Sequence, residues 1–231
     1  MMWVFATRSR FSNCARFIES WIRTGASSPV YVRMDEDDPD LEAVLKLPWP
    51  SNFELVVGPQ ARVGQAMNEM FNKYPNEPWY GILADDQVPK TQHWDQRLIE
   101  AAVPDQISYA NDVYEKRIRI CHPCVGGDLV RTVGFFSIPT VRHFGTDTFW
   151  EQLHHCCNKH GRLNDVVVEH AHFNFEQSPL DATYQRSQSI RREDKIAFKK
   201  YMNEHFEAIM RRIENNHPTW KKVKDRSGGW V

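Results

Sequence analysis

Residues 79–86 read Trp79-Tyr80-Gly81-Ile82-Leu83-Ala84-Asp85-Asp86, an apolar run that ends in two adjacent carboxylates. The run has the length and composition of a buried strand, and the turn residues Gln87-Val88-Pro89 indicate that the strand ends at the acidic pair. Open α/β folds bind their ligands at the carboxyl edge of the sheet. Two carboxylates at that edge favour a divalent cation held against a phosphorylated ligand. The stretch therefore predicts an enzyme that uses a metal and a nucleotide.

Segments of strand character alternate with segments of helical character along the chain. Besides 79–84, apolar runs of strand length occur at 3–6, 30–32, 53–57, 107–110, 118–121, 134–138 and 165–172. The spacing of apolar residues predicts helices over 12–24, 63–72, 92–102 and 149–159. This alternation implies βαβ units, so we expect an α/β fold with a mixed, mostly parallel sheet flanked by helices.

The C-terminal part of the chain differs from the rest in charge. From Arg186 to the end there are 12 Lys and Arg against 6 Asp and Glu, which leaves 17 of the 29 cations and 24 of the 30 anions in the first 185 residues. An amphipathic helix is predicted over 193–215 from the apolar stripe Met202, Phe206, Ile209, Met210 and Ile213. We expect a domain over 1–185 and a basic helical extension over 186–231 packed on it. Its charge indicates either a solvated helix face or contact with a polyanion such as nucleic acid.

Composition is typical of a soluble protein, and we expect a cytoplasmic one. Of 231 residues 41% are hydrophobic, which suffices for a core. No apolar stretch approaches the roughly 20 residues of a membrane span, and the first residues lack the basic region of a signal peptide. The five cysteines are odd in number and irregularly spaced, which favours free thiols. A structural zinc site is the alternative, built from Cys121-His122-Pro123-Cys124 with Cys156-Cys157 or His154-His155.

Two histidines add to the acidic pair. Strand alternation in residues 166–172 places His170 and His172 on one face. Carboxylate oxygens with imidazole nitrogens suit Mn²⁺ or Mg²⁺, so the predicted metal ligands are Asp85, Asp86, His170 and His172. Adjacent strand residues point to opposite faces, so the two aspartates share one ion only if the chain turns there. The alternatives are an acid pair that caps the next helix and two histidines that serve only as hydrogen-bonding groups.

A set of motifs, taken in chain order, resembles the GT-A glycosyltransferases, most closely small family 2-like members of bacteriophage and bacterial genomes. The motifs are Thr7-Arg8-Ser9-Arg10, the acidic loop at Asp35, Gly64 with Asn68, Ile82-Leu83-Ala84-Asp85-Asp86, Gly126-Gly127, Gly145-Thr146-Asp147 and Glu169-His170-Ala171-His172. The resemblance spans about residues 3–184. It implies a Rossmann-like GT-A fold and metal-dependent transfer of a sugar from a nucleotide-sugar donor, with a UDP-sugar expected. Many relatives carry Asp-x-Asp where this chain has Ala84-Asp85-Asp86, which leaves open which aspartate binds the metal.

The resemblance also implies a role for each motif. Contacts to the base and ribose would come from Thr7, Arg8, Arg10 and Asp35. Contacts to the diphosphate would come from Arg62, Gly64 and Asn68. The metal would neutralise the departing diphosphate, which makes Asp86 part of the catalytic machinery. Asp147 would be the catalytic base, with a plain helix cap as the alternative, and Gly126 and Gly127 would let a sugar approach the backbone.

The acceptor of the sugar is a separate question. The basic extension and the phage-like resemblance favour DNA that carries a hydroxyl-bearing modified pyrimidine, which the enzyme would expose from the base stack. A glycan or another small acceptor is the alternative. Two other functions compete with sugar transfer: a nucleotidyltransferase on the same sheet edge, and a noncatalytic module that binds nucleic acid.

Overall fold

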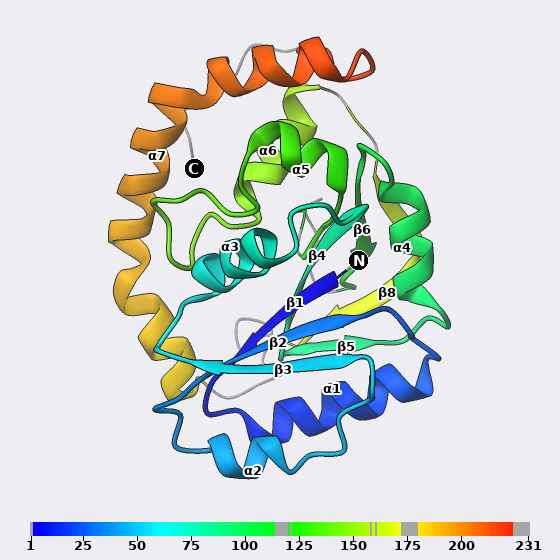
Figure 1. Ribbon diagram of the computed structural model, residues 1–231, viewed down its shortest axis with the longest axis vertical. Helices are drawn as coiled ribbons and strands as arrows, with labels where there is room; N and C mark the ends of the chain where they lie inside the picture. Colours follow the sequence, from blue (N-terminus) through cyan, green and yellow to red (C-terminus); the bar gives the residue numbers. More distant parts are fainter. Residues whose placement is uncertain are drawn as a thin grey trace.

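The computed structural model describes residues 2–113, 120, 122–157, 159, 161–171 and 180–223. Within these residues, a central eight-stranded sheet has the order β3-β2-β1-β4-β7-β6-β8-β5 (Figure 1). The strands are β1 Met2–Thr7, β2 Val30–Asp35, β3 Phe53–Gly58, β4 Trp79–Ala84, β5 Gln87–Pro89, β6 Ile107–Asn111, β7 Cys124–Gly126 and β8 Arg162–His170. The helices are α1 Phe11–Arg23, α2 Leu41–Leu45, α3 Val63–Lys73, α4 Trp94–Ala102, α5 Gly127–Val133, α6 Thr148–Cys156 and α7 Ala182–Asn216.

The sheet is mixed and mostly parallel, as the sequence predicts. Strands β3, β2, β1 and β4 run parallel, whereas β7 is antiparallel to β4 and β6. Strand β8 is parallel to β6, and β5 is antiparallel to β8. The four parallel strands end together, so Thr7, Asp35 and the pair Asp85-Asp86 come to the same edge of the sheet.

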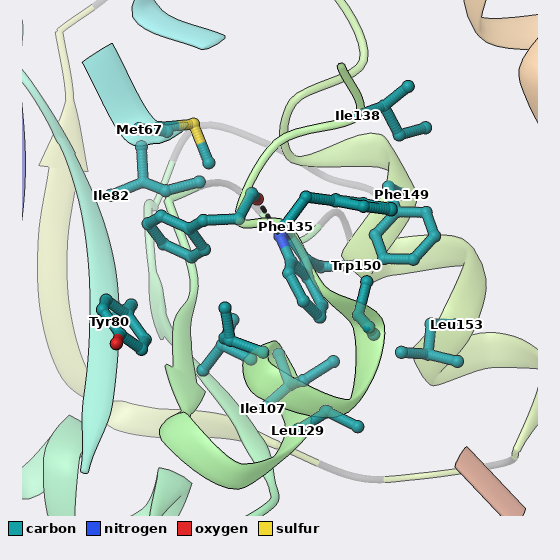
Figure 2. Close-up of a cluster of buried hydrophobic side chains, with 14 of the residues drawn as sticks. Met67, Tyr80, Ile82, Ile107, Leu129, Phe135, Ile138, Phe149, Trp150 and Leu153 are labelled. Carbon is teal, nitrogen blue, oxygen red and sulfur yellow. Dashed lines mark hydrogen bonds between the residues drawn. The ribbon is translucent and has the colours of Figure 1, made fainter. Parts of the chain in front are cut away.

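Two apolar clusters cover the two faces of the sheet. Alternate residues of β1 enter different clusters: Val4 faces one side, while Trp3 and Phe5 face the other. The cluster around Val4 takes side chains from α3, α5, α6 and α7, and the opposite cluster takes them from α1, α2 and α4. Figure 2 shows part of the first cluster, where the indole of Trp150 donates a hydrogen bond to the Phe136 carbonyl at 3.0 Å.

The strand predicted over 134–138 is wrong, because these residues form an irregular segment after α5. The side chain of Asn68 makes the hydrogen bonds to this segment that a neighbouring strand would otherwise make. Its Oδ1 accepts from the amides of Phe136 and Ser137 at 3.1 and 2.9 Å, and its Nδ2 donates to the Ser137 carbonyl at 2.8 Å. The apolar residues that suggested a strand are buried in the core without one.

Other predicted boundaries shift at sheet edges and helix starts. Residues 87–89 form β5 where only a turn was predicted, and β8 covers 162–170 in place of 165–172. The strand predicted over 118–121 falls, apart from residue 120, outside the described residues.

Helix α7 is much longer than the predicted 193–215. It spans 35 residues, and Asp181 caps its start by accepting from the Tyr184 amide at 2.9 Å. In Figure 1 it follows one side of the molecule and then bends across the end that holds α5 and α6. The predicted division at residues 185 and 186 falls inside this helix. No helix in the described part of the chain is both long and apolar enough to cross a membrane.

Candidate active site

Two side chains from the N-terminal part of the chain donate hydrogen bonds to Asp85. Its Oδ2 accepts from the Thr7 hydroxyl at 2.9 Å, and its Oδ1 accepts from Nη1 of Arg10 at 2.7 Å. Both oxygens are therefore occupied, and the residue is 5% exposed. Asp85 ties the end of β4 to the end of β1, and it offers no unpaired oxygen to a cation.

Asp86 has a different environment. Its Oδ2 accepts from the hydroxyl of Tyr184 at 2.7 Å and lies 3.4 Å from Nε2 of His170. Its Oδ1 is buried and has no hydrogen-bond partner among the described residues. The backbone fixes this arrangement, because Gln87 pairs with His170 across β5 and β8 and the Ala171 amide donates to the Asp86 carbonyl at 2.8 Å. An orphaned buried carboxylate oxygen is costly unless a further ligand binds it.

The surroundings split the acidity of the two aspartates. Burial raises the pKa of Asp85 above its usual range, although Arg10 acts in the opposite direction. Burial would also raise the pKa of Asp86, but His170, His122 and Tyr184 outweigh it and hold that pKa below its usual range. Asp86 is thus the member of the pair that stays ionised most firmly.

Arg10 is the cation that the protein itself places beside the pair. Its Nε and Nη2 each lie 3.1 Å from an oxygen of Asp181, and its guanidinium carbon stacks 3.9 Å from the centre of the Tyr184 ring. Its Nη1 is 3.9 Å from Oδ2 of Asp86. Three carboxylates, Asp85, Asp86 and Asp181, thus face one guanidinium, which leaves two negative charges without a cation as long as His170 is neutral.

The residues present fit a divalent cation. The deficit of two charges, the free Oδ1 of Asp86 and the adjacent imidazole of His170 form the donor chemistry that Mn²⁺ or Mg²⁺ takes. Within the described ranges, no group of three or more His, Cys, Asp or Glu side chains is placed to hold an ion. The predicted ligand His172 lies outside those ranges.

The residues predicted to contact the base and ribose, which follow the first two strands, lie close to one another. Asp35 is 3% exposed, accepts from the Ala61 amide at 2.8 Å, and pairs with Arg8 at 3.0 Å. Arg8 also pairs with Asp37, and Nη1 of Arg186 lies 3.7 Å from Asp35. The ends of β1 and β2 and the start of α7 therefore form one charged wall next to the acidic pair.

Three residues were predicted to contact the diphosphate. Arg62 is the charged one, and its side chain extends toward this wall. Its Nη1 donates to the Arg186 carbonyl at 3.4 Å, and burial together with Arg186 and Arg142 lowers its pKa. Gly64 is a packing residue, since a Cβ there would lie 2.8 Å from the Val141 carbonyl oxygen. The side-chain amide of Asn68 hydrogen-bonds to the segment after α5. The structure therefore gives Gly64 and Asn68 supporting positions.

Asp147 precedes α6 and makes no side-chain cap, so the plain-cap alternative finds no hydrogen bond to support it. Burial raises its pKa above the usual range. His170 acts in the opposite direction and lowers that pKa slightly by its charge.

Gly126 and Gly127 do not lie with the other predicted residues. Gly126 pairs with Trp79, at the start of β4, whereas the acidic pair follows its end about 20 Å away. A Cβ at either glycine would overlap backbone atoms, of Pro104 at Gly126 and of Glu77 at Gly127. These glycines allow close packing between segments of the chain itself.

Four residues at the site were not predicted from sequence: Asp181, Tyr184, His122 and His143. Asp181 carried a usable signal, because an aspartate directly before a helix-compatible segment is a strong N-cap. The His122 ring meets that of His170 edge-on at 4.8 Å. Burial and Arg62 lower the pKa of His143 to about 4, so it is neutral near pH 7.

The zinc alternative is not supported in the part of the chain that can be seen. Cys121 lies outside the described residues. Cys124, Cys156 and Cys157 are buried and form no disulfide among the described residues, and burial raises the pKa of Cys157 to about 12. Among those residues, no three His, Cys, Asp or Glu side chains gather at a site that could hold an ion.

Comparisons with known proteins give similarity of structure only. No model of a protein family matches the sequence, and no curated protein matches it. Among solved structures, the chain is similar to the mannosyltransferase PcManGT from Pyrobaculum calidifontis, which was solved with GDP-Man and Mn²⁺. The TM-score is 0.55 at 11% identity, over 94% of this chain and 72% of that one. It is also similar to residues 1–349 of S. aureus TarS, with a TM-score of 0.53 at 11% identity, over 95% of this chain and 77% of that one.

At sequence identities this low, the similarity concerns the fold alone. The matches extend over nearly the whole chain, and the strand order brings the acidic pair to the carboxyl edge of the sheet. The chain therefore has a GT-A glycosyltransferase-like fold.

Proposed function

We propose that this chain is a metal-dependent glycosyltransferase that moves a sugar from a nucleotide-sugar donor to a hydroxyl group. The observation that carries the proposal is the carboxylate of Asp86 at the carboxyl edge of a GT-A-like sheet: its buried Oδ1 has no hydrogen-bond partner among the described residues, and its Oδ2 lies 3.4 Å from Nε2 of His170. The similar mannosyltransferase, solved with GDP-Man and Mn²⁺, supports a donor and a cation of these classes.

The described residues divide the work along the sheet edge. Asp86 and His170 would hold Mn²⁺ or Mg²⁺, with His172 as a further candidate ligand. When bound, the cation supplies positive charge for the departing diphosphate. Arg62 and Arg186 add positive charge on the same side, and Arg8 with Asp35 lines the nucleoside end. Thr7 and Arg10 keep Asp85 in place, which fixes the turn that carries Asp86.

Asp147 is our candidate for the general base. A carboxylate whose pKa is raised by burial holds a proton more readily near neutral pH than an exposed one. It would accept the proton of the acceptor hydroxyl while the sugar leaves the diphosphate. The charge of His170, a proposed cation ligand, is among the influences on its pKa.

For the acceptor we favour nucleic acid, because α7 carries cations that the protein does not neutralise. Five exposed cations lie within about three turns of the helix, between residues 191 and 200: Arg191, Arg192, Lys195, Lys199 and Lys200. None of them forms an ion pair with a carboxylate among the described residues. Many surface cations elsewhere do form one, as in Lys73–Glu54, Lys90–Glu169, Arg97–Asp165, Arg131–Asp128, Arg142–Glu193 and Lys222–Glu207.

The packing of α7 favours a phosphodiester backbone over a lipid surface as its binding partner. A helix that binds a bilayer inserts a free apolar face. The apolar face of α7 is already buried in the core through Phe198, Met202 and Phe206. We propose a DNA strand with a hydroxyl-bearing modified pyrimidine as acceptor and a UDP-sugar as the first donor to test.

Thermal unfolding with nucleotides and Mn²⁺ tests the proposed function. We expect UDP or a UDP-sugar together with Mn²⁺ to raise the Tm, and Asp86→Asn to abolish that rise. The matched control is Asp165→Asn, an exposed aspartate that pairs only with Arg97, which should respond as the wild type does. If neither uridine nor guanosine nucleotides with Mn²⁺ stabilise the wild type, the proposal is wrong.

Binding to an oligonucleotide that contains hydroxymethylated pyrimidine tests the acceptor. If all five cations contact phosphates, affinity should fall by roughly 10²-fold or more for a fourfold rise in salt. Lys195→Glu should weaken binding, and Lys46→Glu, an exposed lysine at the end of α2, should not. Binding to anionic vesicles in place of DNA would indicate a lipid-linked acceptor, and activity on a free sugar without DNA binding would indicate a glycan.

A further inference from the structure

The start of α7 reaches into the acidic pair through Tyr184. This residue is 5% exposed, and its hydroxyl donates to Oδ2 of Asp86 at 2.7 Å across 98 positions of sequence. The face of its ring lies against the guanidinium of Arg10, which in turn holds Asp85. One side chain of the C-terminal helix thus contacts the machinery around both aspartates.

The hydrogen bond selects which oxygen of Asp86 is available. Because the Tyr184 hydroxyl donates to Oδ2, the carboxylate cannot rotate without losing that hydrogen bond, and Oδ1 stays the oxygen without a hydrogen-bond partner among the described residues. Groups that orient a metal-binding carboxylate in this way commonly contribute 10- to 100-fold to affinity for the ion. The Tyr184 hydroxyl is placed to do so, because it is a neutral donor that adds no charge to compete with a cation.

Contacts between the helix start and the loop after β1 fix the position of Tyr184. Asp181 accepts from the Tyr184 amide at 2.9 Å and pairs with Arg10 through the same carboxylate. The hydroxyl of Thr183 donates to the Arg8 carbonyl at 2.8 Å. The start of α7 is therefore bound to the loop after β1 through two residues that lie just before Tyr184.

We propose that Tyr184 is a positioning residue of the cation site, which α7 contributes to orient Asp86. This inference rests on the proposed function, because it concerns the same ion. It makes the first turn of α7 a part of the active site and separates it from the basic stretch that follows.

The test compares Tyr184→Phe with Tyr201→Phe by titrating Mn²⁺ into each protein with a nucleoside diphosphate present and following the Tm. The control makes the same change on the same helix, where the ring of Tyr201 packs on Phe135 and His205. We expect Tyr184→Phe to raise the Mn²⁺ concentration at half effect by roughly 10- to 100-fold, and Tyr201→Phe to leave it unchanged. In steady-state assays the loss at Tyr184 should shrink as Mn²⁺ is raised.

The outcomes separate the inference from the function on which it rests. If the wild type responds to Mn²⁺ and both variants match it, Tyr184 does not position Asp86 and the inference is wrong. If the wild type itself does not respond, the proposed function and the inference fail together. If Tyr184→Phe unfolds, the comparison of Asp181→Ala with Asp181→Asn provides the second test: both remove the same charge, but only alanine removes the cap that holds the helix start and Tyr184, so Asp181→Ala should weaken Mn²⁺ binding more. An equal Mn²⁺ response in the two Asp181 variants would contradict the inference.

Discussion

The guanidinium of Arg10 lies 2.7 Å from Oδ1 of Asp85, although 75 positions separate them in the sequence. Both side chains are buried, with exposed fractions of 5% and 7%. This ion pair joins the entry of α1 to the exit of β4, and the acidic pair keeps its geometry only while it is intact. Stability and site geometry therefore depend on the same contact.

Replacing Arg10 should expose that dependence. In Arg10→Met the carboxylate of Asp85 loses its cation but stays buried, so we expect a loss of about 3–5 kcal/mol in the free energy of unfolding. The added change Asp85→Asn should recover much of it, because the buried carboxylate that depended most on Arg10 is then neutral. Urea denaturation of both variants measures the difference, and equal stability of the single and double variants would contradict the interpretation.

Asn68 should prove to be a structural residue. Asn68→Ala removes three hydrogen bonds to the segment after α5 and leaves backbone groups of Phe136 and Ser137 without them. We expect a loss of about 3 kcal/mol by urea denaturation. Donor affinity measured well below the melting temperature should stay within about twofold of the wild type. A large loss of affinity with normal stability would instead support the diphosphate role that the sequence suggested.

Gly127 and Gly134 offer a comparison between crowding and backbone strain. A Cβ at Gly127 would overlap the Glu77 carbonyl, whereas one at Gly134 meets nothing within 4 Å but sits at a φ of +88°. We expect Gly134→Ala to cost about 1–2 kcal/mol and Gly127→Ala to cost more, since backbone must move. Thermal denaturation ranks the two variants, and the reverse order would mean that the segment before β4 yields easily.

Asp147→Asn should separate chemistry from binding. If Asp147 is the base, its amide should lower kcat by about 10²- to 10⁴-fold while the donor still binds. Asp128→Asn is a suitable control, because Asp128 lies in the first turn of α5 and pairs with Arg131. Loss of donor binding or of folded protein in Asp147→Asn would assign the residue a structural role.

His143 should make the protein less stable as the pH falls. Burial and Arg62 lower its pKa to about 4 in the folded state, below the ordinary 6.5. The folded state therefore binds fewer protons than the unfolded state between these values, and stability decreases as the pH falls from about 6.5 to about 4. Urea denaturation should show a shallower decrease in His143→Gln than in the wild type. Identical pH profiles would rule out a neutral buried His143.

The sequence predicted the half of the site that follows from strand ends. The run before Asp85 is apolar enough to identify β4, and parallel strands must end at one edge, so Arg8, Asp35 and the acidic pair meet there. Such contacts are consequences of sheet topology. Glycines carry less information, because Gly126 and Gly127 relieve crowding at the opposite end of β4 and look the same in sequence as glycines that approach a ligand.

The part of the site that was missed comes from long-range packing. Residues 182–192 are polar, and only Tyr184, Ser187 and Ile190 among them are buried, so the start of α7 shows little apolar periodicity. The irregular segment at 134–138 was taken for a strand because its side chains enter the core, while its hydrogen bonds go to Asn68. In both cases the deciding partner lies more than 60 positions away.

The length of α7 has a consequence for shortened forms of the protein. The same continuous helix that holds Tyr184 in its first turn also covers the core with Phe206, Ile209 and Ile213. A premature stop codon between residues 200 and 206 would leave every proposed cation ligand in the polypeptide but would remove these apolar side chains and expose the core that they cover. We expect such a product to be lost to aggregation and proteolysis instead of persisting as a weakened catalyst.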